Sequence, residues 1–279
     1  MNDPAPSPRN EPNAPDAWTG LKRFTQARIA LGRTGESQTT AAVLAFGLAH
    51  AQARDAVHLP MDAGSVSAAL EAAGFLTLRA HSRARDRREY LLRPDHGRRL
   101  SEESRSALTE ARSADAASPV DVVFVVADGL SAFAPTLHAV PLLTELRKRL
   151  DGWRIAPVVV ALQARVALGD EIGELFGAGL VVMLIGERPG LSSPDSLGLY
   201  LTHRPKVGRS DAERNCISNV RPGGLDYETA AFKLHYLMEE ARRLGLSGIA
   251  LKDGSGTLPL RSLFGGERSE GALRPFGAG

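Results

Sequence analysis

Four polar or glycine-rich segments each follow a short apolar run, and their residue types are suited to binding a ligand. These segments are Ala127–Ser131, Gln163–Val166, Gly186–Gly190 and Arg214–Asn219. If the apolar runs are strands of one parallel sheet, the segments lie at its carboxyl edge, where open α/β sheets bind their ligands. We therefore expect all of them to converge on one large ligand.

Two of these segments carry charged groups with more than one interpretation. Glu187 and Arg188 put a carboxylate beside a guanidinium before a Pro-Gly turn, either as ligand contacts or as a solvated ion pair worth about 0–1 kcal/mol. The run from Asp128 to Ser131 could present backbone amides at a helix N-terminus to an anion. The alternative is an ordinary strand-to-helix turn.

Cys216 is the single thiol of the chain, so it forms no intrachain disulfide and no multi-cysteine zinc site. No histidine lies near it in the sequence to activate a nucleophile, and a small buried apolar role is the alternative. The seven histidines show no metal-ligand spacing. We assign no catalytic residue and no metal ligand to this chain.

Composition excludes several classes of function. The net charge is only +2, which gives no general field for nucleic acid or an anionic membrane. The one arginine cluster, residues 83–99, contains Tyr90 as its single aromatic residue, which favours a protein interface or a solvated face over a nucleic-acid groove. No Gly-x-Gly-x-x-Gly follows the first predicted strand of the sheet, and no Gly-x-x-x-x-Gly-Lys occurs in the sequence. A Rossmann dehydrogenase and a P-loop enzyme are therefore disfavoured. With no signal peptide and no long apolar span, we expect a soluble cytoplasmic protein.

Residues 21–117 are predicted to form a smaller, mainly helical domain. Helices are predicted over residues 41–60 and 64–73 and from residue 101 onward, and two short strands at 75–78 and 90–92 are predicted to pair as a hairpin. The Pro-rich residues 1–20 before this domain are expected to be disordered.

After Pro119 the pattern becomes that of a sheet covered on both faces. The β-branched runs 120–126, 157–162 and 180–185 predict strands, as does 249–251, while 140–150, 169–176 and 227–244 predict helices. Strand and helix in alternation predict the α/β class, with a Rossmann-like, mostly parallel sheet and helices on both faces. This domain is placed at residues 118–253, before a Gly-rich tail at 254–279.

Taken together, these segments resemble the small (light) chain of ethanolamine ammonia-lyase, an adenosylcobalamin-dependent enzyme. The matching blocks are Ala27–Arg33, Arg93–Leu100, Asp128–Ser131, Arg165–Gly173, Gly186–Leu191 and Arg214–Asn219. They span about Phe24 to Asp253. Ala164 departs from the pattern, because the family often has glycine there, and Gln38 departs where Leu-Pro-Thr is common nearby.

The resemblance implies a small subunit that binds adenosylcobalamin against a large TIM-barrel subunit, which holds ethanolamine. It implies cofactor contacts at Val166, Glu187 and Cys216. Because the chain lacks the Asp-x-His-x-x-Gly motif that supplies a cobalt ligand, it implies base-on binding. The implied reaction is homolysis of the cobalt–carbon bond, hydrogen abstraction from ethanolamine, and release of acetaldehyde and ammonia. Bacterial microcompartments are an additional expected location, with the Pro-rich tail as the address.

Two other functions stay open at this point. The first is a non-catalytic nucleotide-binding or scaffold protein with a Rossmann-like sheet. The second is a stand-alone hydrolase that uses Cys216, for which replacement of the thiol would abolish turnover.

Overall fold

A computed structural model describes residues 17–25, 27–32, 37–114 and 120–257 of the chain. Its centre is a sheet of six strands in the order β1-β3-β2-β4-β5-β6. The first four neighbours, β1 (Thr77–His81), β3 (Val158–Leu162), β2 (Val122–Ala127) and β4 (Leu180–Gly186), run parallel. The last two, β5 (Leu197–His203) and β6 (Arg214–Val220), run antiparallel to their neighbours. The fold is thus α/β, as predicted, but its sheet is mixed and not mostly parallel.

The connection after β4 explains why the sheet becomes mixed. Residues 187–196 contain no helix, and a parallel return needs a crossover of a dozen or more residues, usually helical. The chain therefore turns back and β5 pairs antiparallel with β4, from Leu180 opposite His203 to Gly186 opposite Leu197. Neither β5 nor β6 was predicted; Arg214–Asn219, which lies in β6, was expected to be a ligand-binding turn.

The three apolar runs predicted as strands after Pro119 are confirmed as β2, β3 and β4. Every residue of β2 and of β4 is buried, which fits strands covered on both faces. Along β2, Val122, Phe124 and Val126 join one apolar core, while Val123, Val125 and Ala127 join the other. Each face of the sheet thus has its own layer of helices.

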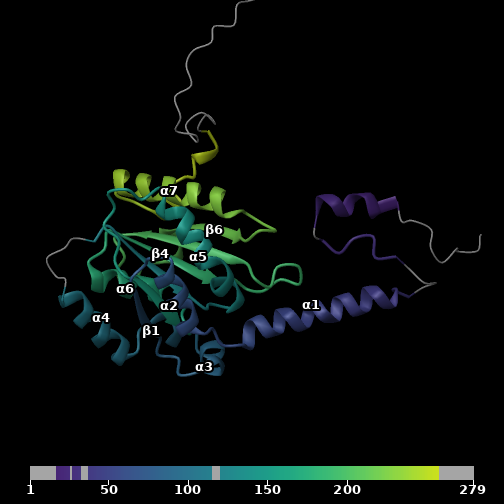
Figure 1. The fold of residues 1–279 in the computed structure, drawn as a ribbon, viewed down its shortest axis with the longest axis horizontal. Coiled ribbons are helices and arrows are strands. Elements are labelled where there is room, and N and C mark those ends of the chain that lie inside the picture. The colour runs from purple at the N-terminus through teal and green to yellow at the C-terminus, as the bar shows by residue number, and fades with distance from the viewer. Residues whose placement is uncertain (1–16, 26, 33–36, 115–119, 258–279) are drawn as a thin grey trace, which may run out of the picture.

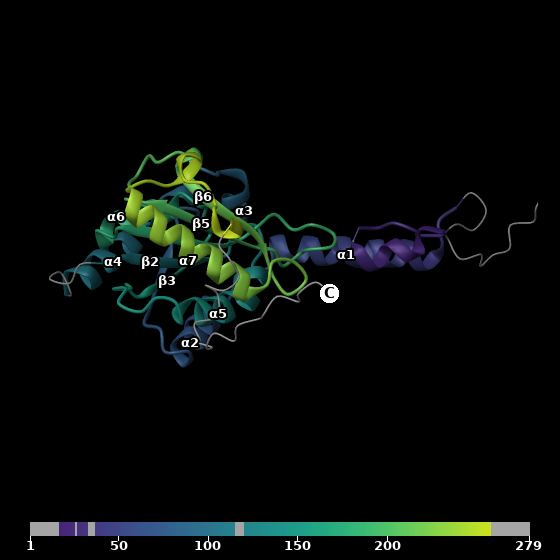
Figure 2. The ribbon, with the colours of Figure 1, turned by 90° about the horizontal axis from the view of Figure 1, so that it is seen from above.

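One core contains α2 (Ala63–Ala72), α5 (Phe133–Arg147) and α7 (Tyr227–Leu244), and the other contains α4 (Glu102–Ala114) and α6 (Leu168–Phe176). Figures 1 and 2 show this layered body. The predicted helices at 64–73, 169–176 and 227–244, and the one from residue 101, are confirmed. Helix α5 begins at Phe133, seven residues before the predicted start at 140, and it contains Pro141 in its interior. Short 3-10 helices occur at Ala17–Phe24, His96–Arg98, Asp211–Glu213, Gly248–Ala250 and Ser255–Thr257.

The predicted hairpin between residues 75 and 92 is wrong. Its first strand lies at Thr77–His81 as β1 and pairs with β3, and its second is helix α3 (Arg87–Leu92). The Asp86 carboxylate accepts a hydrogen bond from the Glu89 amide at 2.8 Å and so caps α3, which fixes the helical start. The strand predicted at 249–251 is also wrong, because Gly248 adopts φ +78° and begins a 3-10 turn.

Helix α1 (Thr40–His58) is confirmed where it was predicted, and it extends away from the layered body (Figure 1). Only Ala49 and Ala56 are buried along it, and Leu44 and Leu48 are exposed. No helix among the described residues has both the length and the apolar character required to cross a bilayer.

The division of the chain into domains at residues 117 and 118 stays a prediction. Strand β1 precedes this boundary, yet it pairs along its whole length with β3 after the boundary, from Thr77 opposite Val158 to His81 opposite Leu162. The two predicted domains would therefore share one sheet. The predicted tails, residues 1–20 and 254–279, lie for the most part outside the described residues.

Candidate functional site

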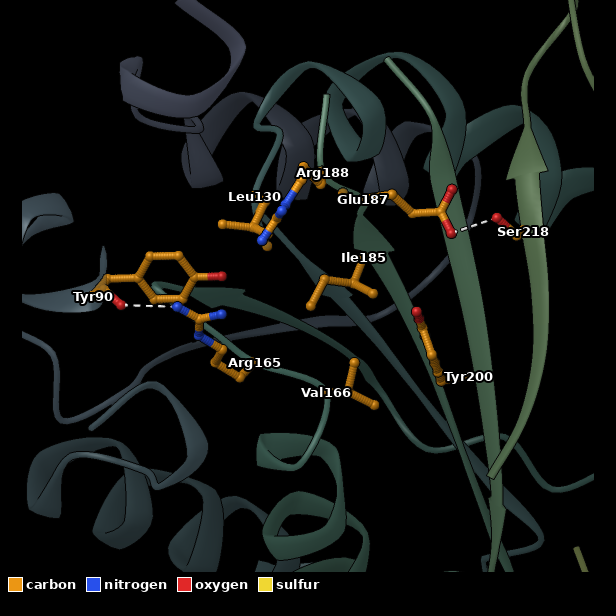
Figure 3. A pocket seen from close by; sticks show the side chains of 11 residues that line it. Tyr90, Leu130, Arg165, Val166, Ile185, Glu187, Arg188, Tyr200 and Ser218 are labelled. Carbon is orange, nitrogen blue, oxygen red and sulfur yellow. Dashed lines mark hydrogen bonds between the residues drawn. The ribbon is translucent and has the colours of Figure 1, made fainter. Parts of the chain in front are cut away.

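A cavity of about 430 Å³ lies at the carboxyl ends of β2, β3 and β4 (Figure 3). All four segments singled out from the sequence contribute to its wall, although Arg214–Asn219 does so from the antiparallel strand β6, so their convergence on one ligand stays a prediction. From these segments come Gly129, Leu130, Arg165, Val166, Gly186, Glu187, Arg188 and Ser218, and the wall is completed by Tyr90, Ile185 and Tyr200.

Glu187 lies directly after β4, and its carboxylate joins that strand end to β6. It accepts hydrogen bonds from the Ser218 hydroxyl at 2.6 Å, from the Asn219 amide at 3.1 Å and from the Ser196 hydroxyl at 2.5 Å. Oε2 takes two of these bonds and Oε1 takes one, which leaves a lone pair of Oε1 free among the described residues. Glu187 is therefore a fixed acceptor in the wall and not one half of a solvated pair with Arg188.

The turn that carries Val166 is held in place by the buried carboxylate of Asp128. This carboxylate accepts hydrogen bonds from the amides of Gln163 at 2.9 Å and Ala164 at 3.1 Å, and the Arg87 guanidinium lies 3.6 Å away. Burial raises the pKa of Asp128, while the two amides and Arg87 oppose that shift. Gln163 adopts φ +53°, a left-handed conformation that these bonds stabilise. Asp128, directly after β2, thus positions the Val166 turn, which follows β3.

The amides of the Asp128–Ser131 turn do not face a ligand. The Leu130 amide donates to the Gly186 carbonyl at 2.9 Å, and the Ser131 amide donates to the Asp128 carbonyl at 3.2 Å. A Cβ at Gly129 would lie 2.2 Å from the Gly186 carbonyl oxygen, so the two turns are in direct backbone contact. The ordinary-turn interpretation of this segment is therefore the correct one.

Tyr90 is a wall residue that the sequence reasoning did not select. Its ring lies between two guanidinium groups, with the Arg87 Cζ 4.6 Å and the Arg165 Cζ 4.4 Å from the ring centroid. Its hydroxyl points toward the middle of the cavity (Figure 3) and has no hydrogen-bond partner among the described residues. Burial raises the pKa of Tyr90 to about 12, so the hydroxyl stays a donor. The one available signal was an aromatic residue alone in an arginine cluster.

Arg165 is held by the segment that follows α3. Its amide donates to the Gly97 carbonyl at 2.8 Å, and its guanidinium donates to the Tyr90 carbonyl at 3.1 Å. A Cβ at Gly97 would lie 2.7 Å from Cγ of Arg165, so the close approach requires glycine. The α3 segment and the turn after β3 therefore form one wall.

Cys216 lies on β6 beside the cavity and does not line it. It is paired across the strands with Tyr200, which does line it. Cys216 is exposed, in contrast to the buried alternative considered from the sequence. Desolvation by the surrounding protein raises the pKa of its thiol above the ordinary 9.0; the hydrogen bond with Tyr200 opposes this shift, and the Glu187 charge adds to it. A thiol that resists ionisation is a poor nucleophile, which argues against the hydrolase.

Across the part of the chain that the structure describes, no group of three or more His, Cys, Asp or Glu side chains is placed to hold a metal ion. His138 illustrates the structural use of a histidine. It is buried and its ring nitrogens lie 2.8 Å from the Tyr227 hydroxyl and 3.0 Å from the Asp195 carboxylate.

Comparison with known proteins identifies the family. The model of the ethanolamine ammonia-lyase light chain (EutC) family matches residues 15–252. The chain belongs to the ethanolamine ammonia-lyase light-chain family. It is thus a component of an ammonia-lyase, as the resemblance predicted.

Several small subunits from this family are similar over most of their length. The ethanolamine ammonia-lyase small subunit of Pseudomonas fluorescens (strain Pf0-1) is 55% identical over 267 residues, covering 95% of each chain. That of strain SBW25 is 58% identical over 238 residues, covering 85% of this chain and 86% of the relative. That of Ralstonia nicotianae is 56% identical over 238 residues, covering 85% and 88%. The match to the light-chain family therefore covers every strand and helix of the layered body.

Proposed function

We propose that this chain binds adenosylcobalamin at the cavity between Tyr90 and Tyr200, and that the large subunit of ethanolamine ammonia-lyase forms the opposite wall. The observation that carries the proposal is the convergence of all four ligand-type segments on one cavity in a chain of this family. The reaction assigned to the complex is conversion of ethanolamine to acetaldehyde and ammonia. On this proposal the isolated small subunit is inactive.

The chemistry of the wall fits a corrin with amide arms. Val166, Leu130 and Ile185 offer apolar surface for the ring, and polar groups beside them are placed to fix its orientation. The free lone pair of Glu187 Oε1 suits an amide N–H, and the Tyr90 hydroxyl suits an amide carbonyl. Both are held rigidly before any ligand arrives, which lowers the entropy cost of binding.

Cys216 is the least direct of the three proposed cofactor contacts. It lies opposite Tyr200 on the adjacent strand, so it could touch a ligand that extends past the cavity rim. Its exposure and neutral thiol are compatible with packing against an apolar group of the cofactor. We propose this packing role for Cys216.

Base-on binding is part of the same proposal. Among the described residues that line the cavity there is no histidine that could replace the benzimidazole of the cofactor below cobalt. When bound, adenosylcobalamin supplies the radical chemistry. Residues of this chain bind it, orient it and keep water from one side of it.

The decisive experiment is reconstitution of the full chain with the large subunit. Acetaldehyde is expected only when adenosylcobalamin and both subunits are present. The complex is also expected to retain cobalamin through gel filtration, seen as its absorption band. A scaffold or nucleotide-binding protein would elute without that band, and a complex that does so overturns the proposal.

For location, we propose the cytoplasm and, within it, a microcompartment addressed by the Pro-rich residues 1–20. A chain without these residues is then expected to leave the microcompartment fraction while keeping its activity in the complex. Unchanged fractionation after the deletion removes the address from the proposal.

A further inference from the structure

A second cavity, of about 650 Å³, adjoins the first and carries arginines that the proposed corrin site does not use. The two cavities share Arg165, Val166 and Tyr200, so they form neighbouring parts of one hollow. The remaining wall includes Arg98, Arg99 and Arg209 and one carboxylate, Asp211.

The charges of this second cavity do not cancel. Arg99 lies 3.0 Å from Glu171, but the same carboxylate also binds Arg105 at 2.5 Å. Thus two guanidinium groups share one buried carboxylate.

The other ion pairs at this cavity leave two of its arginines without a carboxylate partner among the described residues. Arg209 is paired with Glu213, and Asp211 accepts from Arg214 at 3.1 Å. Among the described residues, neither Arg98 nor Arg165 has a carboxylate partner. The second cavity therefore keeps a surplus of positive charge beside the proposed corrin site.

The surplus charge indicates an anionic group of a particular kind. Guanidinium groups bind phosphate oxygens through directional, charge-assisted hydrogen bonds. The amide arms of a cobalamin are neutral, and the phosphodiester of its nucleotide tail is its one anionic group. A ligand whose corrin occupies the first cavity could carry that phosphodiester into the second, because the two are contiguous at Arg165.

We infer that the second cavity binds the phosphodiester of the cobalamin nucleotide tail, with Arg98 as a direct contact and Arg165 at the junction with the corrin site. The inference rests on the proposed function. Arg98 is suited to this role because it is exposed and none of its guanidinium donors has a partner among the described residues. Arg209 is not, since its donors are bound to Glu213 and to the Arg204 carbonyl.

The test measures affinities of the complete complex for cyanocobalamin and for dicyanocobinamide, which lacks the phosphodiester, ribose and benzimidazole. Arg98→Ala is expected to weaken cyanocobalamin binding roughly tenfold, as for loss of a hydrogen bond to a charged group. Binding of dicyanocobinamide is expected to stay unchanged. Arg98→Glu should lower cyanocobalamin affinity further, and Arg98→Lys should keep most of it because the charge remains.

The matched control is Arg93→Ala, which removes a nearby exposed arginine that is paired with Asp95 and lines neither cavity. It should leave both affinities unchanged. Thermal melting of each variant checks that the chain folds.

Three results would overturn the inference. One is an Arg98→Ala variant that binds cyanocobalamin as the wild type does, and another is an equal loss for both corrinoids. A third is a pair of results: the Arg98→Glu variant no longer binds the large subunit, while the Arg98→Ala complex keeps its corrinoid affinity. Together they would indicate that the cavity binds carboxylates of the large subunit. Failure of the wild-type complex to bind either corrinoid would instead defeat the proposed function, and with it this inference.

Discussion

At the scale of single residues, the wall of the cavity depends on polar side chains fixed by other parts of the protein. Tyr90 is the clearest case, because two guanidinium groups fix its ring while its hydroxyl is left without a partner. The hydroxyl faces the cavity, so it is available to donate a hydrogen bond to a ligand. The proposed pairing of Tyr90 with a cofactor amide is therefore open to a direct test.

We predict that Tyr90→Phe lowers the affinity of the reconstituted complex for cobalamin roughly twofold to tenfold, the range for one neutral hydrogen bond. The melting temperature should change little, since the phenyl ring still packs between Arg87 and Arg165. Titration followed by cobalamin absorbance measures the affinity. Tyr236→Phe is the control, because Tyr236 lines neither cavity. Equal affinities for wild type and Tyr90→Phe would show that the hydroxyl makes no bond to the cofactor.

Cys216 allows a pH prediction from its raised pKa. A thiol pKa above 9.0 means that the thiolate fraction at pH 8 is smaller than for an ordinary cysteine and grows only as pH rises past 9. Alkylation of the full chain by iodoacetamide should therefore reach half its maximal rate above pH 9. Since this is the only cysteine, Cys216→Ala gives the background directly. A midpoint at pH 8 or below would contradict the prediction and reopen a nucleophilic role.

At the scale of elements, a buried ion pair connects helix α6 to strand β6. Asp170 in the first turn of α6 accepts two hydrogen bonds from Arg214, at 2.6 and 2.7 Å, and both side chains are almost fully buried. The Thr202 hydroxyl on β5 lies 3.1 Å from the same guanidinium. This contact fixes the position of α6, and hence of the Val166 turn before it, against the antiparallel strands.

We predict that Asp170→Ala lowers the free energy of unfolding by about 3–5 kcal/mol, because the buried Arg214 charge loses its buried carboxylate partner and keeps only the exposed Asp211. The double variant Asp170→Leu, Arg214→Met should be less destabilised than Asp170→Ala alone, since no buried charge remains. Urea denaturation measures both. Glu240→Ala, which breaks the surface ion pair with the exposed Arg243, serves as the control and should cost less than about 1 kcal/mol. A similar cost for Asp170→Ala and Glu240→Ala would exclude this role for the pair.

At the scale of the whole molecule, the sheet draws its edge strand from the amino-terminal half of the chain. Strand β1 covers β3, and α2 and α4 join the cores on its two faces through Leu70 and Leu108. A chain that began at residue 118 would lose these helices and expose an apolar edge strand at Val158–Leu162, which favours aggregation.

We predict that such a chain, residues 118–279, is insoluble or melts without a cooperative transition. A chain that begins at residue 38 should keep the sheet and melt cooperatively, because it retains α1 and everything that packs on β3. Circular dichroism during heating compares the two. A cooperative melt of residues 118–279 near the temperature of the full chain would instead support an independent carboxyl-terminal domain at the predicted boundary.

The sequence by itself determined the α/β class, three of the strands, most of the helices and the four segments that meet at the cavity. These features depend on local patterns, such as the unbroken apolar run from Val122 to Ala127 and the Gly245 stop of α7, which takes φ +71°. The same local patterns predicted that the segments of Val166 and Glu187 lie at the edge of the sheet, and both residues line one cavity there.

Only the tertiary structure decided the direction of β5 and β6 and the presence of Tyr90 in the wall. The direction of β5 follows from the lack of a crossover helix after Glu187, and the place of Tyr90 follows from stacking on Arg165, far along the chain. Apolar periodicity reports whether a segment is buried, but hydrogen-bond partners and ring contacts between distant segments leave no periodic trace in the sequence. Such contacts exist only once the layers of helices have packed on the sheet.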